Sequence, residues 1–134
     1  MQIENKTLQV VEEPIELSVI CVDDDPEVTD ALRRRFQLLN VTVHSASDGA
    51  EGVWLASSKR PDVVIADISM PGINGIQLVE CLKANPSTAS IPIFILSGRN
   101  DKQLMSRLDA LGVNRIFHKP ADLSEILLAF LMTF

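Results

Sequence analysis

The sequence predicts an α/β domain in which a five-stranded parallel sheet is flanked by five helices. From Ser18 onward, short apolar runs alternate with segments of helical periodicity. The runs at 19–22 and 62–66 are apolar almost throughout, which is typical of parallel strands that helices cover on both faces. With 134 residues and a hydrophobic fraction of 46%, the chain suits one compact domain with its own core.

Two strand–helix units are predicted in the first half of the chain. Residues 19–22 form the first strand, and Pro26 follows at a helix start, where its fixed φ is favourable. Residues 41–45 alternate between apolar and polar side chains, as in a short second strand. The Ser-Asp-Gly sequence at 47–49 then opens a second helix, which is expected to run to about residue 58.

Three further units complete the pattern. A helix over 76–84 is stopped by Asn85 and Pro86, and a helix marked by leucines at 104, 108 and 111 is ended by Gly112. Asp122 and Glu125 resemble a capping box that opens the last helix. The remaining predicted strands cover residues 62–66, 91–96 and 115–119.

Polar side chains stand where four of the predicted strands end. Asp23 and Asp24 follow the first strand, and Asp67 follows the third. Ser97 and Lys119 close the fourth and fifth strands. Right-handed crossovers place the carboxyl ends of parallel strands at one edge of the sheet, where open α/β sheets bind their ligands. We therefore expect these five side chains to converge.

This combination of side chains indicates a metal-assisted phosphoryl site. Three close carboxylates repel one another unless a cation neutralises them, and oxygen ligands with open positions suit Mg²⁺. Lys119 adds an ammonium group and Ser97 a hydroxyl, so negative charge on a phosphoryl group would be met from two sides. A carboxylate can itself be the nucleophile and form an aspartyl phosphate. Each residue alone would be an ordinary cap, turn or surface residue, and their joint placement carries the interpretation.

Four pieces of sequence stand in order over nearly the whole chain and resemble a known family. Through them, residues from about 18 to 134 resemble the receiver domain of bacterial two-component response regulators. The resemblance implies a flavodoxin-like three-layer sandwich with strand order 2-1-3-4-5. The pieces are Val22-Asp23-Asp24-Asp25-Pro26, Asp67-Ile68-Ser69-Met70-Pro71-Gly72-Ile73-Asn74-Gly75, Ser97-Gly98 and Lys119-Pro120.

The resemblance implies a role for each matching residue. Asp67 would be the phosphoacceptor, Ser97 the switch hydroxyl and Lys119 the group that binds the phosphoryl oxygens. A sensor histidine kinase or a histidine phosphotransfer protein would supply the phosphoryl group, and the Lys119–Pro120 bond would be cis. The Mg²⁺ ligands would be Asp24, Asp67 and the backbone carbonyl of Ser69, with Asp23 acting through water.

One position departs from the family's pattern. Receiver domains usually carry Tyr or Phe three residues before the lysine, and Ile116 stands there in this chain. An isoleucine can change rotamer, but it cannot bury or expose a ring. We expect that phosphorylation chemistry is kept while the output signal is altered or weaker.

The last helix is apolar on more than one face. Its predicted core stripe contains Leu123, Ile126, Leu127, Phe130, Leu131 and Phe134. Leu128 and Met132 add a second ridge at i, i+4 spacing, which is either a generous core stripe or an interface. The interface would receive a second copy of the chain or a downstream domain.

Composition limits the remaining possibilities. The net charge of −6 argues against direct nucleic-acid binding, and no apolar run is long enough to span a membrane. The N-terminus lacks the pattern of a secretion signal and neither cysteine belongs to a metal-ligand motif, so we expect a cytoplasmic protein. Residues 1–16 fall outside the repeating pattern and are expected to be a leader or tail before the domain at 17–134.

Two other functions compete with a phosphorylated receiver. A Mg²⁺-dependent phosphatase with an aspartyl nucleophile usually has a second acid two residues later, and Ser69 occupies that position here. A receiver-like binding module that switches without phosphorylation is the alternative that Ile116 leaves open. The matching site residues that argue against it are Asp24, Asp67, Ser97 and Lys119. Under both hypotheses, the phosphorylated receiver and the receiver-like binding module, we expect the domain to be a switch and not an enzyme.

Overall fold

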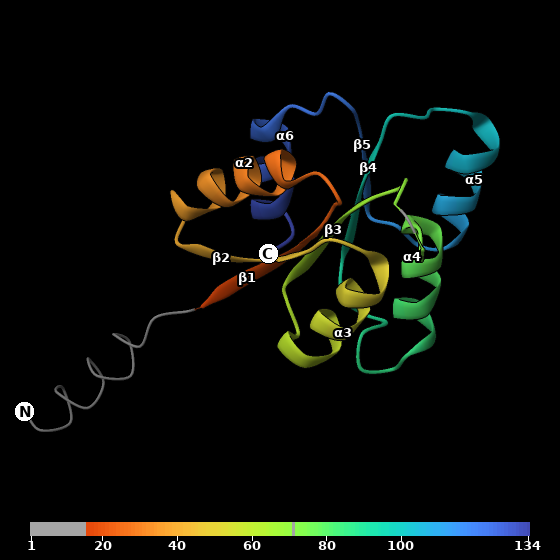
Figure 1. The fold of residues 1–134 in the computed structure, drawn as a ribbon, viewed down its shortest axis with the longest axis horizontal. Coiled ribbons are helices and arrows are strands. Elements are labelled where there is room, and N and C mark those ends of the chain that lie inside the picture. The colour runs from red at the N-terminus through yellow and green to blue at the C-terminus, as the bar shows by residue number, and fades with distance from the viewer. Residues whose placement is uncertain (1–15, 71) are drawn as a thin grey trace, which may run out of the picture.

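A computed structural model describes residues 16–70 and 72–134 of the chain (Figure 1). All but the last residue of the expected leader at 1–16 therefore lies outside the described residues. The five strands pair in parallel in the order β2-β1-β3-β4-β5, which confirms the predicted sheet. The strands are β1 (Leu17–Val22), β2 (Val41–Ala46), β3 (Val63–Asp67), β4 (Ile93–Ser97) and β5 (Arg115–His118). The helices are α2 (Pro26–Gln37), α3 (Gly49–Lys59), α4 (Gly75–Ala84), α5 (Lys102–Ala110) and α6 (Leu123–Leu131).

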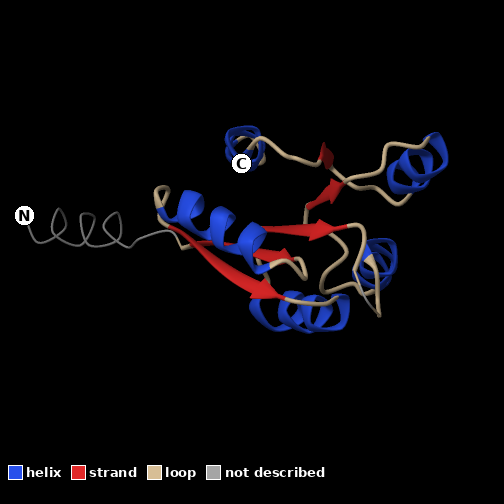
Figure 2. Ribbon diagram, turned by 45° about the horizontal axis from the view of Figure 1, so that its top comes forward, coloured by secondary structure: helices blue, strands red, loops and turns tan. Residues whose placement is uncertain are grey.

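The helices cover the sheet in two layers, so the three-layer sandwich is confirmed (Figure 2). On one face, α2 and α6 bury Phe36 and Phe130, whose rings meet edge to face at 5.1 Å. On the other face, α3, α4 and α5 bury a cluster that includes Leu78 and Leu108. Because both faces of the sheet are covered, every residue of β3 and β4 is buried.

Each described helix begins at an aspartate or asparagine whose side chain accepts a backbone N–H of the first turn. This satisfies donors that would otherwise lack a partner. The predicted reciprocal cap at α6 is wrong, because Asp122 accepts from the N–H of Ser124 and no bond from the Asp122 N–H to Glu125 is formed. The described residues form such a reciprocal pair at α4, between Asn74 and Gln77.

The third strand is shifted by one residue from its predicted bounds. Asp62 lies just before β3, and its carboxylate accepts the Ser18 N–H of β1 at 2.8 Å. Asp67 is the last residue of β3 and pairs with Leu96 of β4. Its backbone is therefore held by the sheet ladder. The fourth strand is also shorter than predicted, since it begins at Ile93.

The predicted core stripe of the last helix is only partly correct. Ile126 and Phe130 are fully buried, but Leu131 is 49% exposed and Phe134 is 63% exposed. The helix ends at Leu131, so Phe134 lies beyond it, and its ring meets the Phe130 ring edge to face with the centroids 5.0 Å apart. In the described part of the chain, no helix has the length and apolar character needed to cross a bilayer.

Candidate functional site

Strand register brings the predicted side chains to one edge of the sheet. Val22 at the end of β1 pairs with Ala66, so Asp23 and Asp67 are the next residues on two adjacent strands. On the other side of β3, Asp67 pairs with Leu96, which precedes Ser97. Ser97 pairs with His118, and the Lys119 N–H donates to the Ser97 carbonyl at 2.8 Å. Five polar residues from four strands thus lie at the same edge.

The three aspartates form a compact cluster that a lysine faces. One carboxylate oxygen from each of Asp23, Asp24 and Asp67 lies within 4.8 Å of the others. The Lys119 Nζ stands 3.3 Å from Asp23 Oδ2 and 3.3 Å from Asp67 Oδ2. Asp23 and Asp67 are buried, whereas Asp24 is exposed. One ammonium group therefore faces three carboxylates, two of which have little access to solvent.

Burial and the neighbouring charges together shift the pKa of Asp23. Burial raises the pKa of the Asp23 carboxyl above its ordinary value of 3.8, and the neighbouring Asp67 charge raises it further. The N–H of Asp25 and the Lys119 ammonium act in the opposite direction without cancelling the rise. For Lys119, burial lowers the pKa, but the charges of Asp23 and Asp67 raise it above 10.5. The cluster would accept further positive charge.

Lys119→Met is expected to raise the pKa of Asp23 further, because the nearest positive charge is removed while the length of the side chain is kept. A folded-state pKa above 3.8 means that the native protein holds this proton more tightly than the unfolded chain. The contribution of Asp23 to stability therefore falls as the pH rises from the unfolded pKa to the shifted one, and the variant extends that fall to higher pH. A carboxyl ¹³C NMR titration measures the shift, with Lys102→Met as the control. An unchanged Asp23 pKa in Lys119→Met would contradict the ion pair.

Ser97 lies at the same edge, but its hydroxyl is engaged elsewhere. Its Oγ donates to the Arg99 carbonyl at 2.7 Å and accepts the Arg99 N–H at 2.9 Å. The hydroxyl is thus held by its own loop, and both bonds must break before it can reach toward Asp67. Ile116, on β5, is partly buried and packs against the core cluster beneath α5.

The loop after β3 is held close to the phosphoacceptor candidate. The Ser69 N–H donates to Asp67 Oδ1 at 3.3 Å, and Ser69 itself is exposed. The Gly75 N–H donates to the Ile68 carbonyl at 3.1 Å. A Cβ on Gly75 would lie 2.6 Å from the Asp67 carbonyl oxygen, so α4 begins directly against the backbone of β3. No role for Gly75 is predicted from the sequence, although its place at the end of a Pro-Gly-rich turn is a possible signal.

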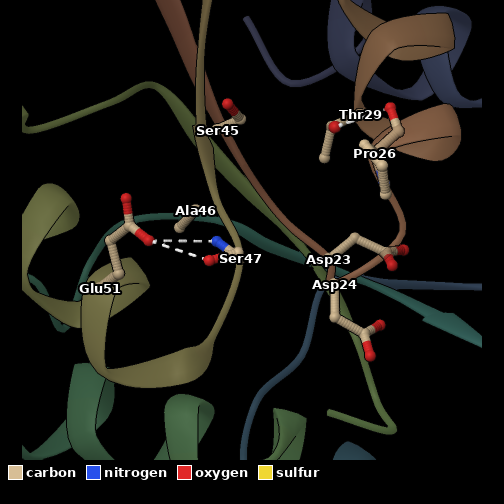
Figure 3. Close-up of a pocket in the computed structure, with 8 residues that line it drawn as sticks. All are labelled: Asp23, Asp24, Pro26, Thr29, Ser45, Ala46, Ser47 and Glu51. Carbon is tan, nitrogen blue, oxygen red and sulfur yellow. Dashed lines mark hydrogen bonds between the residues drawn. The ribbon is translucent and has the colours of Figure 1, made fainter. Parts of the chain in front are cut away.

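A hollow of about 400 Å³ opens beside the two aspartates that follow β1 (Figure 3). Asp23 and Asp24 lie on one side of it, and Glu51 of α3 lies across from them. The Glu51 carboxylate accepts from the N–H and the hydroxyl of Ser47, at 3.2 and 3.3 Å. Glu51 is therefore bonded to the residue before the N-cap of its own helix and does not join the acidic cluster. The positions of Ser47 and Glu51 beside the site are not predicted from the sequence.

The donor set fits a hard divalent cation. All donors in the cluster are carboxylate oxygens from Asp23, Asp24 and Asp67, as such ions prefer. Burial raises the pKa of the Asp23 carboxyl and the nearby Asp67 charge adds to the rise, so a cation beside these carboxylates would favour their ionised forms. The exposed Asp24 and the adjoining hollow leave room for water or a further ligand. The Lys119–Pro120 peptide bond is cis, as the resemblance implied.

Known proteins with related sequences share this domain. A family model described as the response regulator receiver domain matches residues 19–131. Response regulator MprA of Mycolicibacterium vanbaalenii is 34% identical over 110 residues, which cover 81% of this chain and 46% of MprA. Transcriptional regulatory protein PrrA of Mycobacterium tuberculosis is 35% identical over 109 residues, with the same two coverages of 81% and 46%. The chain thus spans a little under half the length of these relatives.

Solved structures share the fold. Chemotaxis response regulator CheY4 of Vibrio cholerae superposes with a TM-score of 0.82 over 90% of this chain and 100% of its own, at 23% identity. The family match at 19–131 contains all four strand ends that form the acidic edge. Sequence, fold and the arrangement of the edge agree, and the chain belongs to the receiver domain family of two-component response regulators.

Proposed function

We propose that Asp67 accepts a phosphoryl group from a phosphohistidine and that this modification switches the domain. The observation that carries the proposal is the position of Lys119, whose Nζ lies 3.3 Å from Asp67 Oδ2 at the edge where Asp23 and Asp24 gather. An ammonium group there can bind the oxygens of a phosphoryl group attached to Asp67. A purely structural ion pair would not require two further carboxylates at the same point.

In the proposed reaction, an Asp67 carboxylate oxygen attacks the phosphorus of the phosphohistidine. The P–N bond breaks as the new P–O bond forms, and the histidine leaves with the electron pair and takes up a proton. The Lys119 ammonium balances charge on the transferred oxygens. Attack of water on the aspartyl phosphate later releases phosphate and restores the Asp67 carboxylate. Ser69 offers no carboxylate that could act as a general acid, so the domain is proposed to be a phosphoacceptor and not a phosphatase.

A Mg²⁺ ion is proposed as the cofactor of this site. Asp24, Asp67 and the backbone carbonyl of Ser69 would hold it, with Asp23 acting through water. The ion would supply charge neutralisation for the phosphoryl oxygens. Burial of Asp23 and the closeness of Asp67 support this proposal, because both leave negative charge that Lys119 alone does not balance.

Incubation of the full chain with acetyl phosphate tests the proposed function. We expect the intact mass to increase by one phosphoryl group in the presence of Mg²⁺ and to remain unchanged when EDTA replaces the ion. Equal phosphorylation in EDTA would contradict the role of the cation. Failure to phosphorylate under both conditions, in a protein that NMR shows to be folded, would favour the alternative of a phosphorylation-independent binding module.

Ile116 is expected to limit how far the signal spreads. When beryllofluoride mimics the phosphoryl group, we predict large amide shifts around the acidic cluster and small ones over 104–119, because no ring is available to change its burial. Ile116→Tyr, which restores the family's aromatic residue, should enlarge the shifts in that segment. Equally large shifts over 104–119 in the unaltered chain would contradict this prediction.

The partners belong to the same proposal. The phosphodonor would be a sensor histidine kinase or a histidine phosphotransfer protein, and we propose that the domain works in the cytoplasm. The relatives MprA and PrrA are a response regulator and a transcriptional regulatory protein, each about twice as long as the matched segment. By analogy, an output domain or a separate partner would read the state of Asp67.

A further inference from the structure

The large apolar side chains exposed by the described residues gather at one end of the domain. Seven such side chains are exposed, and only Trp54 lies apart from the rest. Leu38 is 79% exposed and Met132 is 77% exposed, and it is the gathering of such side chains, more than either one alone, that is informative. Contiguous apolar surface of this kind marks an interaction site. The apolar patch, as we name it, consists of Leu38, Leu39, Leu128, Leu131, Met132 and Phe134.

The apolar patch also contains a hollow. A hollow of about 290 Å³ lies between the end of α2 and the outer face of α6. Leucines from both sides line it, and Arg35 and Ser124 form its polar border. The Arg35 Nη1 contacts the Ser124 Oγ at 3.5 Å, a long contact. The site is remote from Asp67, since α2 and α6 end at the opposite edge of the sheet.

We propose that the N-terminal segment, residues 1–15, covers the apolar patch of its own chain. Leu17 pairs with Val41, and Val41 follows Leu39 by two residues, so the segment joins the domain directly beside the patch. Figures 1 and 2 both show the beginning of β1, the loop after α2 and the end of α6 at the same end of the molecule. Fifteen residues can span up to about 50 Å when extended, which exceeds the length of the nine-residue helix α6, about 14 Å.

The composition of the segment matches the surface. It contains five aliphatic residues, and Glu12 and Glu13 follow the first four of them. Arg34 and Arg35 lie at the end of α2, and neither pairs with a carboxylate among the described residues. Glu12 and Glu13 can meet these arginines while the aliphatic residues before them reach α6. The aliphatic residues are Ile3, Leu8, Val10, Val11 and Ile15.

A tether favours this occupant over a second copy of the chain. A covalent link of a few residues provides an effective concentration in the millimolar range, so weak apolar contacts suffice for an intramolecular complex. A second copy would have to supply the same contacts at its actual concentration and bring two pairs of arginines together, if the patches met face to face. The proposal does not depend on phosphorylation of Asp67.

Paramagnetic relaxation in the full chain tests the proposal. A nitroxide is attached at Asn5→Cys in a Cys81→Ser background, because Cys81 is the exposed thiol. Cys21 is buried and burial raises its pKa to about 12, so it will not react with the label. We expect the amide signals of Leu38, Leu128 and Met132 to lose most of their intensity. The double substitution Val10→Asp and Val11→Asp should restore the intensity, and the control Gln9→Asp should not.

Three results would overturn the proposal. Broadening of the same signals in a mixture of labelled ¹⁴N protein and unlabelled ¹⁵N protein would show that a second copy occupies the patch. Signals of α6 that stay sharp, or broadening that the double substitution leaves unchanged, would show that the segment is not seated there. The comparison is made at α6, where only a docked segment brings the label close. Val41 is left out of the comparison because it adjoins the point where the segment joins the domain.

Discussion

Asp67→Asn is expected to abolish phosphorylation and leave the domain folded. The amide keeps the shape of the carboxylate but cannot act as the nucleophile toward a phosphohistidine or acetyl phosphate. The change removes one of three carboxylates that lie within 4.8 Å of one another, so repulsion in the cluster decreases. It also removes one of the two ion pairs of Lys119, and the pair with Asp23 remains. We therefore expect no mass increase with acetyl phosphate and a melting temperature that does not fall.

Asp48→Asn is the matched control for this substitution. Asp48 accepts the Glu51 N–H as the N-cap of α3, and asparagine caps a helix equally well. This variant should fold and become phosphorylated like the unaltered chain. Phosphorylation of Asp67→Asn at an undiminished rate would place the phosphoacceptor elsewhere. Unfolding of Asp67→Asn would contradict the expectation that repulsion among the three carboxylates costs stability.

Gly75→Ala is expected to destabilise the domain and to slow phosphorylation. The added Cβ would lie 2.6 Å from the Asp67 carbonyl oxygen and 2.7 Å from the Ile68 Cα, and both are backbone atoms that cannot rotate away. Overpacking of this kind costs about 1–3 kcal/mol. Alanine favours a helix over glycine by about 0.5–1 kcal/mol, so the clash outweighs the gain. Because the contact is with Asp67 itself, the shift needed to relieve it also moves the reacting carboxylate.

Urea unfolding and the rate of phosphorylation by acetyl phosphate measure both effects. Gly98→Ala is the stability control, since an added Cβ there meets no heavy atom within 4 Å. We expect Gly98→Ala to unfold at the same urea concentration as the unaltered chain. Equal stability of Gly75→Ala would show that α4 can move away from β3 without loss, and would contradict the close approach described above.

Much of the site could be predicted because strand ends are easy to recognise in a parallel α/β sequence. Asp23 and Asp67 each follow an apolar run, and the topology brings all such ends to one edge. Sequence does not reveal how a side chain is used once it is there. The Ser97 hydroxyl is held by the backbone of Arg99, two residues away, and only the loop geometry shows this. The approach of Gly75 to Asp67 depends likewise on how α4 meets β3.

The last helix shows a different limit of prediction. Helical periodicity identified its buried face correctly through Ile126 and Phe130. It did not indicate where the opposing layer stops, and so Leu131 and Phe134 were assigned to the core although they lie beyond its edge. The same cause explains the misjudged cap at Asp122, because a favourable spacing to Glu125 does not fix the rotamer that a reciprocal bond needs. Local sequence patterns therefore predicted where the helices and strands lie. Only the structure showed how far the packing against the last helix extends.

The proposed function depends most on Asp67 as the acceptor of the phosphoryl group. Borohydride reduction converts an aspartyl phosphate to homoserine, which peptide mass spectrometry can assign to a single residue. We predict that the full chain, treated with acetyl phosphate and Mg²⁺ and then reduced, carries homoserine at position 67 and at no other aspartate. Homoserine at Asp23 or Asp24, or a phosphoryl group on a residue outside the acidic cluster, would contradict the proposed function.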